Sequence, residues 1–561
     1  WIGIHPYNFL IELLKFTNPV QIADKTLINH SLMRAAAILL SLFLSLPIIG
    51  LLLPLFWGGG QPLSSAELGE IGDSTLLHLW NYVLTDYVVT TLLLGLGVGI
   101  GVFILGVGNA WLVANYQFPG KKLFEWGLIL PLAVPAYVMA YLFVDFLQFS
   151  GPLQTILRDS FGIHAALPDP RSLGGAIWTF SLCLYPYVYL VARTSFLDRS
   201  AHLMEAAETL GYSSVEAFIR LVLPMTRPAI FTGIALALME VLADFGAVSY
   251  FGLQTFATGI FKAWLSFGDR MAAVHLSLML LTFVLLVFYW EQHNRSRQRY
   301  ALVNTTSQGV IPKRLQGTHA LYASCFCGLT LFFAFVLPML ILLHLLLSEG
   351  FTMDPRYFSW LKNSLGLAAL TAIVAVICAV FLAYAARLSQ SQTLRSMNRV
   401  LTVGYALPGA VLGVGILSLM GLLDVAWFMS VSVGVLVYAY LIRFLSAGLQ
   451  SIETGLTRIT PAMDGTAALL GAKPWEMIRR IHLPLLRRSV LTALLFVFVD
   501  VMKELPATLL LRPFNLDTLA VATYQLAADE RLAELALPAL SIVLVGLLPV
   551  ILLTRAISKG R

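Results

Sequence analysis

The chain of 561 residues is 58% hydrophobic and only 12% charged, and its mean hydropathy is +0.82. A soluble domain is about 25% charged, so this composition excludes a soluble globular protein. It indicates an all-α polytopic membrane protein.

Twelve apolar runs in the sequence are long enough to cross a bilayer core of about 30 Å. In chain order they lie near residues 33–56, 87–114, 123–147, 173–192, 228–250, 272–290, 320–347, 363–386, 400–420, 425–442, 489–511 and 535–554. This number predicts two six-span halves that share one orientation in the membrane. The expected division is an N-terminal cytoplasmic segment at 1–31, a first half at 32–291, a cytoplasmic linker at 292–318 and a second half at 319–561.

The 36 Lys and Arg residues are distributed unevenly among the loops. The loops at 116–122, 193–227, 291–318, 387–399 and 443–488 hold 21 of them, whereas the alternate loops hold 8. Because basic loops tend to remain in the cytoplasm, this pattern places the first set of loops and both chain ends there. The net charge of +6 therefore reports membrane topology and not a nucleic-acid partner.

A stretch of about 65 residues occurs twice, at 200–264 and at 460–524, with a constant offset of 260. The matched residues include Ser200 and Thr460, Gly211 and Gly471, Leu223-Pro224 and Leu483-Pro484, Glu240 and Asp500, and Asp244 and Glu504. Nearer the N-terminus the offset is 273, as between Pro135 and Pro408, so the first half carries 273 − 260 = 13 extra residues. We expect these extra residues in the outward loop 148–172.

Each copy of the repeat begins with a short helix, and a second helix starts directly after it in a new direction. Gly211 and Gly471 can adopt the left-handed backbone that ends a helix. Ser213 and Glu216 form a capping-box pattern, which predicts a second helix that runs into Leu223-Pro224. Each half thus presents a rigid helical protrusion on the cytoplasmic face, where a partner that contacts both halves would bind.

The first of these loops resembles the EAA loop of ATP-binding-cassette (ABC) importer permeases. The residues that carry the resemblance in the first half are Glu205, Ala206, Ala207, Gly211, Leu223 and Pro224. In the second half the corresponding loop contains Asp464, Ala467, Gly471, Leu483 and Pro484, although Gly465-Thr466-Ala467 replaces Glu-Ala-Ala. The resemblance implies that the loops dock on two copies of a cytoplasmic ABC ATPase subunit, with a substrate-binding protein on the outer face.

The chain contains no G-x-x-x-x-G-K-[S/T] phosphate-binding loop. We therefore expect that it is not itself an enzyme and that it holds no cofactor. ATP and Mg would be bound by the partner ATPase, which hydrolyses the ATP.

Two further stretches resemble fused permeases of bacterial ferric-iron importers. They are Ala243-Asp244-Phe245-Gly246 and Lys503-Glu504-Leu505-Pro506-Ala507-Thr508, and the resemblance extends from about residue 32 to the end of the chain. It implies a multi-pass protein of the bacterial cytoplasmic (inner) membrane that imports ferric iron by alternating access. Permeases for thiamine, aminoethylphosphonate, sulfate and polyamines share the scaffold, and a proton-coupled secondary transporter is the alternative outside the class.

Four carboxylates fall inside apolar runs, where charge is costly and usually faces a cavity or a partner. Glu240 and Asp244 are four residues apart on one helix face, and so are Asp500 and Glu504. Such oxygen-rich groups suit a hard trivalent cation, so we expect transient Fe3+ contacts here and no permanent metal site. The alternative is that the carboxylates pair structurally, for which Lys503 is available.

Overall fold

The structure is a computed structural model that describes residues 19–58, 61–62, 79–162, 168–197, 207, 209, 211–298, 313–348, 353–389, 391–423, 432–457, 459–472 and 474–559. The predicted all-α class is confirmed. The strands among these residues are two-residue pieces: β1 (Trp57–Gly58) pairs with β2 (Gln61–Pro62), and β3 (Tyr116–Gln117) pairs with β4 (Lys313–Arg314).

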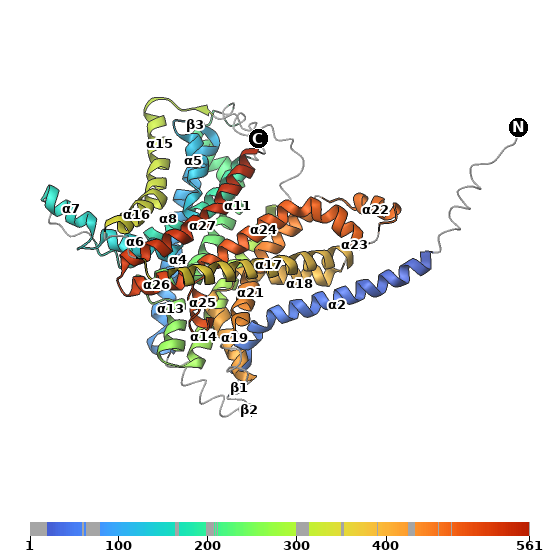
Figure 1. The fold of residues 1–561 in the computed structure, drawn as a ribbon. Coiled ribbons are helices and arrows are strands. Elements are labelled where there is room, and N and C mark those ends of the chain that lie inside the picture. The colour runs from blue at the N-terminus through green and yellow to red at the C-terminus, as the bar shows by residue number, and fades with distance from the viewer. Residues whose placement is uncertain are drawn as a thin grey trace.

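The first half is a bundle of long apolar helices with short helices at its loops (Figure 1). Its α-helices are α2 (Pro19–Leu52), α4 (Leu84–Asn115), α5 (Lys121–Gly127), α6 (Ala136–Leu147), α7 (Pro152–Phe161), α8 (Leu173–Leu197), α10 (Ser214–Ala217), α11 (Leu223–Ala243), α12 (Gly246–Tyr250), α13 (Phe256–Phe261) and α14 (Arg270–Gln298). Short 3-10 helices lie at Leu53–Leu55 and Leu130–Ala133, and π-helical turns at Phe218–Val222 and Lys262–Ser266.

The second half repeats this order. Its α-helices are α15 (Gly317–Leu331), α16 (Leu337–Ser348), α17 (Tyr357–Ser389), α18 (Gln392–Thr402), α19 (Gly409–Leu422), α21 (Val433–Leu456), α22 (Pro461–Leu469), α23 (Pro474–Met477), α24 (Leu483–Lys503), α25 (Pro506–Leu511), α26 (Leu519–Ala528) and α27 (Leu532–Lys559). A 3-10 helix lies at Val403–Ala406, and π-helical turns lie at Phe332–Val336 and Ile478–His482.

The structure confirms the register of the repeat. At an offset of 260, α10, the π-helical turn that follows it and α11 match α23, its π-helical turn and α24 without a gap. At an offset of 273, the starts of α4 and α6 match those of α17 and α19. The offset changes between α6 and α8, so the extra residues lie in the loop 148–172, which contains α7, as predicted.

Within the described residues, nine helices are long and apolar enough to cross a membrane, or up to eleven if each of two bent pairs is one span. The bends, of 95° and 111°, fall before α6 and α19, at Pro135 and Pro408. The remaining expected span, 489–511, corresponds to α24 and α25. α24 contains four charged residues, and it packs against α17, α21 and α27.

The first helix of each half packs against the other half. α2 lies along α17, α18 and α19, whereas α15 lies against α4 and α5, where Asn109 donates a hydrogen bond to Thr330 at 3.3 Å. α2 and α19 cross closely at Gly50 and Gly415. A Cβ at Gly50 would lie 2.2 Å from the Gly415 carbonyl oxygen, so glycine is required at this crossing. Because α2 packs on the second half and α15 on the first half, the two halves interlock.

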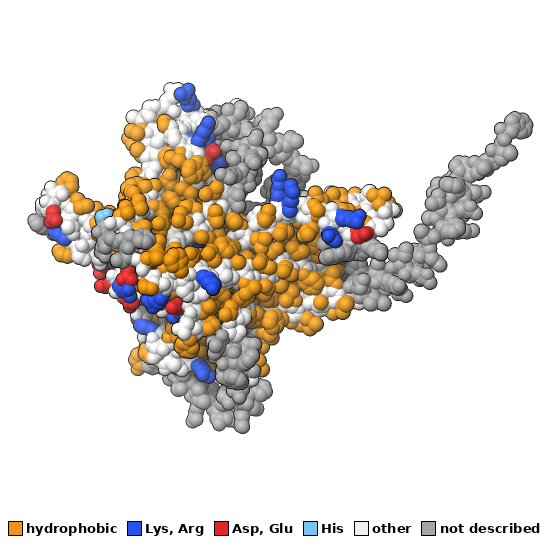
Figure 2. Space-filling model, viewed as in Figure 1, with side chains coloured by type: hydrophobic (Ala, Val, Ile, Leu, Met, Phe, Trp, Pro, Cys, Tyr) orange, Lys and Arg blue, Asp and Glu red, His pale blue; other side chains and the backbone are white. Residues whose placement is uncertain are grey.

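The lateral surface is apolar, as a bilayer requires. Figure 2 shows hydrophobic side chains over most of the visible face, with basic side chains gathered at its upper end and beside α22. Acidic and basic side chains together gather near α26 and the start of α27. Charge is thus concentrated at the two ends of the bundle, which agrees with a membrane-spanning orientation along its length.

Candidate functional site

The four carboxylates predicted from the sequence line one cavity between the two halves. The cavity has a volume of about 130 Å³, well above the ~10–15 Å³ that one water requires. Its charged lining consists of these four acidic residues together with Arg443 and Lys503. In their ionised forms, acidic groups therefore outnumber basic groups by two, in the interior of a membrane protein.

A helix break brings the carboxylates to the cavity in each half. α11 ends at Ala243 and α12 begins at Gly246, while α24 ends at Lys503 and α25 begins at Pro506. Gly246 is needed because a Cβ there would lie 2.7 Å from Leu505 and 2.8 Å from the Cβ of Tyr137.

Asp244 and Glu504 cap the short helices that follow the breaks. The Asp244 carboxylate accepts hydrogen bonds from the backbone N–H groups of Ala247 at 2.8 Å and Val248 at 3.3 Å. Glu504 accepts one from the N–H of Ala507 at 2.9 Å. Both side chains thus satisfy donors that a helix start leaves free, which is a structural role in addition to lining the cavity.

Glu504 also forms a buried ion pair with Arg443, a residue whose position the sequence analysis predicted wrongly. Arg443 Nη1 lies 2.9 Å from Glu504 Oε2, and the side chains are 9% and 4% exposed. The apolar run 425–442 suggested that a span ends just before Arg443, but the span is α21 and carries Arg443 near its middle. The pairing explains the difference, because a partnered arginine can lie inside a bundle where an isolated one cannot.

Glu504→Gln is expected to lower the free energy of unfolding by about 3–5 kcal/mol, because it leaves the buried Arg443 without a counter-ion. The measurement is the melting temperature of the purified protein in detergent. Glu530→Gln is the control: Glu530 pairs with Arg171 at 3.7 Å, both side chains are well exposed, and such a pair contributes about 0–1 kcal/mol. A Glu504→Gln protein that melts like the control would contradict this role.

Glu240 and Asp500 are less engaged than the other two carboxylates. Glu240 accepts one hydrogen bond, from the Tyr405 hydroxyl at 2.9 Å. Asp500 accepts no hydrogen bond from the described residues, and its charged neighbours include Lys503 and Glu240. Lys503 donates to the Leu132 carbonyl at 3.0 Å and forms no ion pair with a described carboxylate. The oxygens of Glu240 and Asp500 therefore remain available to a ligand in the cavity.

No group of three or more His, Cys, Asp or Glu side chains within the described parts of the chain is close enough to hold a metal ion. The four carboxylates face a common space but are spread around it. Any contact with a cation would therefore be made by one or two carboxylates at a time in this conformation.

The loop of the first half is described only from Ala207 onward, since Glu205 and Ala206 lie outside the described residues. Ala207 is fully buried, and its carbonyl accepts the Tyr212 N–H at 3.0 Å across Gly211, whose φ is +80°. This is the left-handed helix end that the sequence predicted. The Ser213–Glu216 capping box is also present, and its hydrogen bonds hold the pKa of Glu216 below the usual value.

The second loop has the same backbone and an additional polar brace. Ala472 N–H donates to the Ala467 carbonyl at 3.0 Å across Gly471, whose φ is also +80°. Asp464 accepts one hydrogen bond from Arg387 at 2.6 Å and contacts His482 Nε2 at 2.7 Å. Burial raises the pKa of Asp464, but these two partners outweigh it, so the pKa lies below its usual value.

Arg387 connects this loop to the membrane helices. It also donates to the carbonyls of Leu456 at 2.8 Å and Ile459 at 2.9 Å, at the end of α21. One guanidinium therefore joins α17, α21 and α22, and through Asp464 it reaches His482 at the start of α24. No pattern in the sequence indicates this brace, because Asp464 lies 77 residues from Arg387 and 18 residues from His482.

In both halves one helical path joins the loop to the cavity. α10 passes through a π-helical turn into α11, which ends beside Asp244, and α23 passes likewise into α24, which ends beside Glu504. α11 and α24 each have 21 residues, which corresponds to about 31 Å. Leu223 and Pro224, like Leu483 and Pro484, lie at the start of these long helices.

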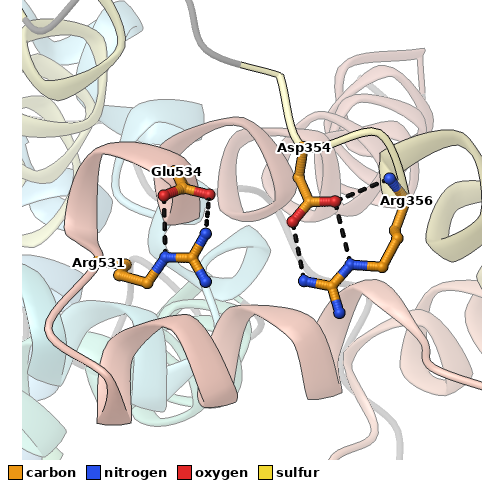
Figure 3. Close-up of polar contacts among 4 residues, drawn as sticks. All are labelled: Asp354, Arg356, Arg531 and Glu534. Atoms are coloured by element: carbon orange, nitrogen blue, oxygen red, sulfur yellow. Dashed lines mark hydrogen bonds and ion pairs between the residues drawn. The ribbon is translucent and has the colours of Figure 1, made fainter.

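The opposite end of the bundle carries a row of ion pairs. Asp354 and Arg356 lie just before α17, and Arg531 and Glu534 lie at the start of α27; in Figure 3 the two pairs stand side by side. Arg356 Nη2 lies 2.9 Å from Asp354, and Arg531 pairs with Glu534. Since α17 begins beside the first pair and ends at the Arg387 brace, these pairs and the second loop lie on opposite faces of the molecule.

Comparison with known proteins agrees with this architecture. The model of the family described as "Binding-protein-dependent transport system inner membrane component" matches residues 105–300. The chain is 28% identical over 484 residues to the Fe(3+)-transport system permease protein FbpB 2 of Haemophilus influenzae, which covers 84% of this chain and 90% of that relative.

Two further relatives are permeases of other transport systems. The chain is 32% identical over 172 residues to the molybdenum transport system permease protein ModB of Escherichia coli, covering 31% of this chain and 71% of that relative. It is 29% identical over 228 residues to the putative 2-aminoethylphosphonate transport system permease protein PhnV of Salmonella typhimurium, covering 38% of this chain and 84% of that relative. The chain therefore belongs to the family of binding-protein-dependent transport system inner membrane components, the multi-pass permeases of ABC transporters.

Proposed function

We propose that this permease imports ferric iron, which a substrate-binding protein delivers to the outer face. The observation that carries the proposal is the cavity between the halves, where four carboxyl groups face two basic groups. A net acidic cavity inside a membrane favours a cation, and a hard trivalent cation prefers carboxylate oxygens. Similarity over most of the chain to a permease named for Fe(3+) transport supports the same substrate.

The energy would come from two copies of an ATPase subunit that bind the loops at Gly211 and Gly471 and hold ATP and Mg. At the end of α22, Leu469 and Leu470 are 90% and 82% exposed, an apolar surface that a docked partner would cover. Movement of a docked loop would pass along α11 or α24 to the carboxylates. The cavity would then open alternately to the outer and inner faces.

Iron uptake into reconstituted vesicles tests the proposal. Vesicles containing the permease, its ATPase and its binding protein should accumulate ferric iron only when ATP is supplied on the ATPase side. A vesicle preparation that takes up no iron, although ATP hydrolysis responds to the binding protein, would refute iron as the substrate.

A second candidate is a permease for another small solute, such as thiamine or a phosphonate. The pair of cationic groups in the same cavity, Arg443 and Lys503, favours an anionic solute of this kind, such as a phosphonate. Competition by these solutes in the iron assay distinguishes the two candidates. A secondary transporter, by contrast, would accumulate its solute without ATP.

The proposed import direction requires the basic loops and both chain ends to be cytoplasmic. In a background without the four native cysteines, a cysteine at Asp529, an exposed position between α26 and α27, should react with an impermeant reagent in intact cells. A cysteine at Ser65 should react as well, whereas one at Ser307 should react only after the membrane is permeabilised. Labelling of Ser307 in intact cells would reverse the inferred direction.

A further inference from the structure

A second cavity lies on the side of the carboxylates nearer the α26–α27 turn. It has a volume of about 200 Å³, and its lining includes Arg171, Tyr250, Tyr524 and Glu530. Arg171 pairs with Glu530 at 3.7 Å, and both side chains are well exposed, so this cavity opens near the surface. The guanidinium of Arg171 also lies 5.3 Å from the ring centroid of Tyr250. This outer cavity shares no lining residue with the carboxylate cavity.

Two tyrosines of α6 fill the space between the cavities. Tyr137 lines the carboxylate cavity and lies within electrostatic range of Asp244 and Glu504. Tyr141, four residues on and on the same helix face, has its ring centroid 6.0 Å from that of Tyr137 and 4.6 Å from that of Tyr250. Tyr137, Tyr141 and Tyr250 therefore form a continuous row of rings from one cavity to the other.

The hydroxyl groups of Tyr137 and Tyr141 lack hydrogen-bond partners among the described residues. The two side chains are 4% and 0% exposed, so the hydroxyls cannot be satisfied by bulk water. A buried polar group without a partner costs about 1–3 kcal/mol. Two such groups, adjacent on one helix face and between two cavities, require an explanation beyond packing.

Packing alone does not require tyrosine at these positions. At the offset of 273, the second half has Ala410 and Val414, so the fold accepts small apolar side chains at the equivalent places. Phenylalanine would fill the same volume without burying a hydroxyl. The feature that phenylalanine lacks is the phenolic oxygen, which is a hard ligand like a carboxylate and which holds ferric iron in tyrosine-ligated haem.

We propose that Tyr137 and Tyr141 are substrate-contacting residues, whose phenolic oxygens bind the hard cation as it passes from the outer cavity to the carboxylates. The inference rests on the proposed ferric cargo. Each phenol that binds as phenolate releases its proton, and the Asp244 carboxylate, which lies within electrostatic range of both tyrosines and has one oxygen outside its two backbone hydrogen bonds, accepts that proton.

The test is uptake of ferric iron by the double variant Tyr137→Phe/Tyr141→Phe in vesicles with the ATPase and the binding protein. Uptake should fall about tenfold for each hydroxyl removed, since an oxygen contact with a charged group is lost. The melting temperature should stay equal or rise, because each change deletes a buried hydroxyl without a partner. A loss of uptake without a loss of stability separates substrate contact from a structural role.

Tyr185→Phe is the matched control. Tyr185 is fully buried, and its hydroxyl also lacks a partner among the described residues. It lines neither cavity and does not belong to the row of rings that Tyr137, Tyr141 and Tyr250 form between them. Its variant should keep wild-type uptake with an equal or higher melting temperature.

Wild-type iron uptake by the double variant would overturn the assignment of Tyr137 and Tyr141, and so would an equal loss of uptake in the Tyr185 variant. Neither result would affect the proposed ferric substrate. If the unmodified permease takes up no ferric iron, the proposed function itself fails, and the two failures are therefore distinguishable.

Discussion

Replacing Gly211 and Gly471 with valine is expected to abolish ATP-driven uptake while the membrane bundle stays assembled. Both glycines have a φ of +80°, where an L-residue costs about 1–2 kcal/mol and a β-branched residue is a genuine outlier. Among the described residues, no neighbouring atom lies within 4 Å of a Cβ built at either position, so the expected effect comes from the backbone. Valine would therefore displace the end of each loop helix without disturbing the packing around it.

Asparagine provides the matched control at both positions, because it tolerates the left-handed region far better than valine does. The measurements are iron uptake and ATP hydrolysis stimulated by the binding protein, each in reconstituted vesicles. We expect the valine variant to lose uptake and the asparagine variant to keep most of it. Full uptake by the valine variant would show that these loops do not transmit the ATPase cycle.

The two loops differ in the polar contacts that fix them to the membrane helices, and this difference is not evident from their sequences. By the EAA pattern the second loop looks degenerate, yet Asp464 joins it to Arg387 and His482. The offsets of the repeat place Ala114 and Val222 where the second half has Arg387 and His482, so these two members of the brace have no polar counterpart in the first half. The second loop is therefore tied more firmly to its membrane helices than the EAA pattern indicates.

The register of the repeat was predictable because it depends on local chemistry. Gly211 and Gly471 end helices by adopting a left-handed backbone, and prolines at the same register begin the bends before α6 and α19. These features need only the neighbouring residues to act. They therefore appear in the sequence in the same order and spacing as in the structure.

Features that depend on distant partners could not be predicted. Arg443 follows an apolar run, which placed it outside the membrane, because its partner Glu504 is 61 residues away in the sequence (504 − 443). The packing of α2 on α19 is likewise invisible in either segment, since a glycine at a helix crossing looks like any other glycine. The four carboxylates could be located from the sequence, but their unequal engagement came only from the structure.

The unequal contacts of the four carboxylates decide which of them should be substituted in a test of transport. Asp244 and Glu504 hold helix starts, so their loss would mix structural and functional effects. Glu240 and Asp500 are engaged least, by one hydrogen bond from Tyr405 and by charged neighbours respectively. The double substitution Glu240→Gln/Asp500→Asn removes two charges and preserves side-chain volume, and the introduced glutamine keeps an acceptor oxygen for Tyr405.

We expect this double variant to lose iron uptake by about 100-fold or more, since two contacts of a charged oxygen with the cation disappear. Its stability should be retained. Two acidic and two basic groups then remain around the cavity, and Lys503 keeps its hydrogen bond to the Leu132 carbonyl. If the carboxylates were purely structural, the variant would instead show a lower melting temperature or poor expression, because a buried basic group would lose its counter-charge.

Uptake and hydrolysis must therefore be measured on the same vesicles, with the melting temperature of the same preparation. Asp529→Asn, an exposed change at the α26–α27 turn, controls for the general loss of an acidic residue and should leave all three quantities unchanged. Stimulated ATP hydrolysis should persist in the double variant, because its loops and helices are unaltered. Normal iron uptake by a stable double variant would remove Glu240 and Asp500 from the transport path and leave the cavity's acidity without a transport role.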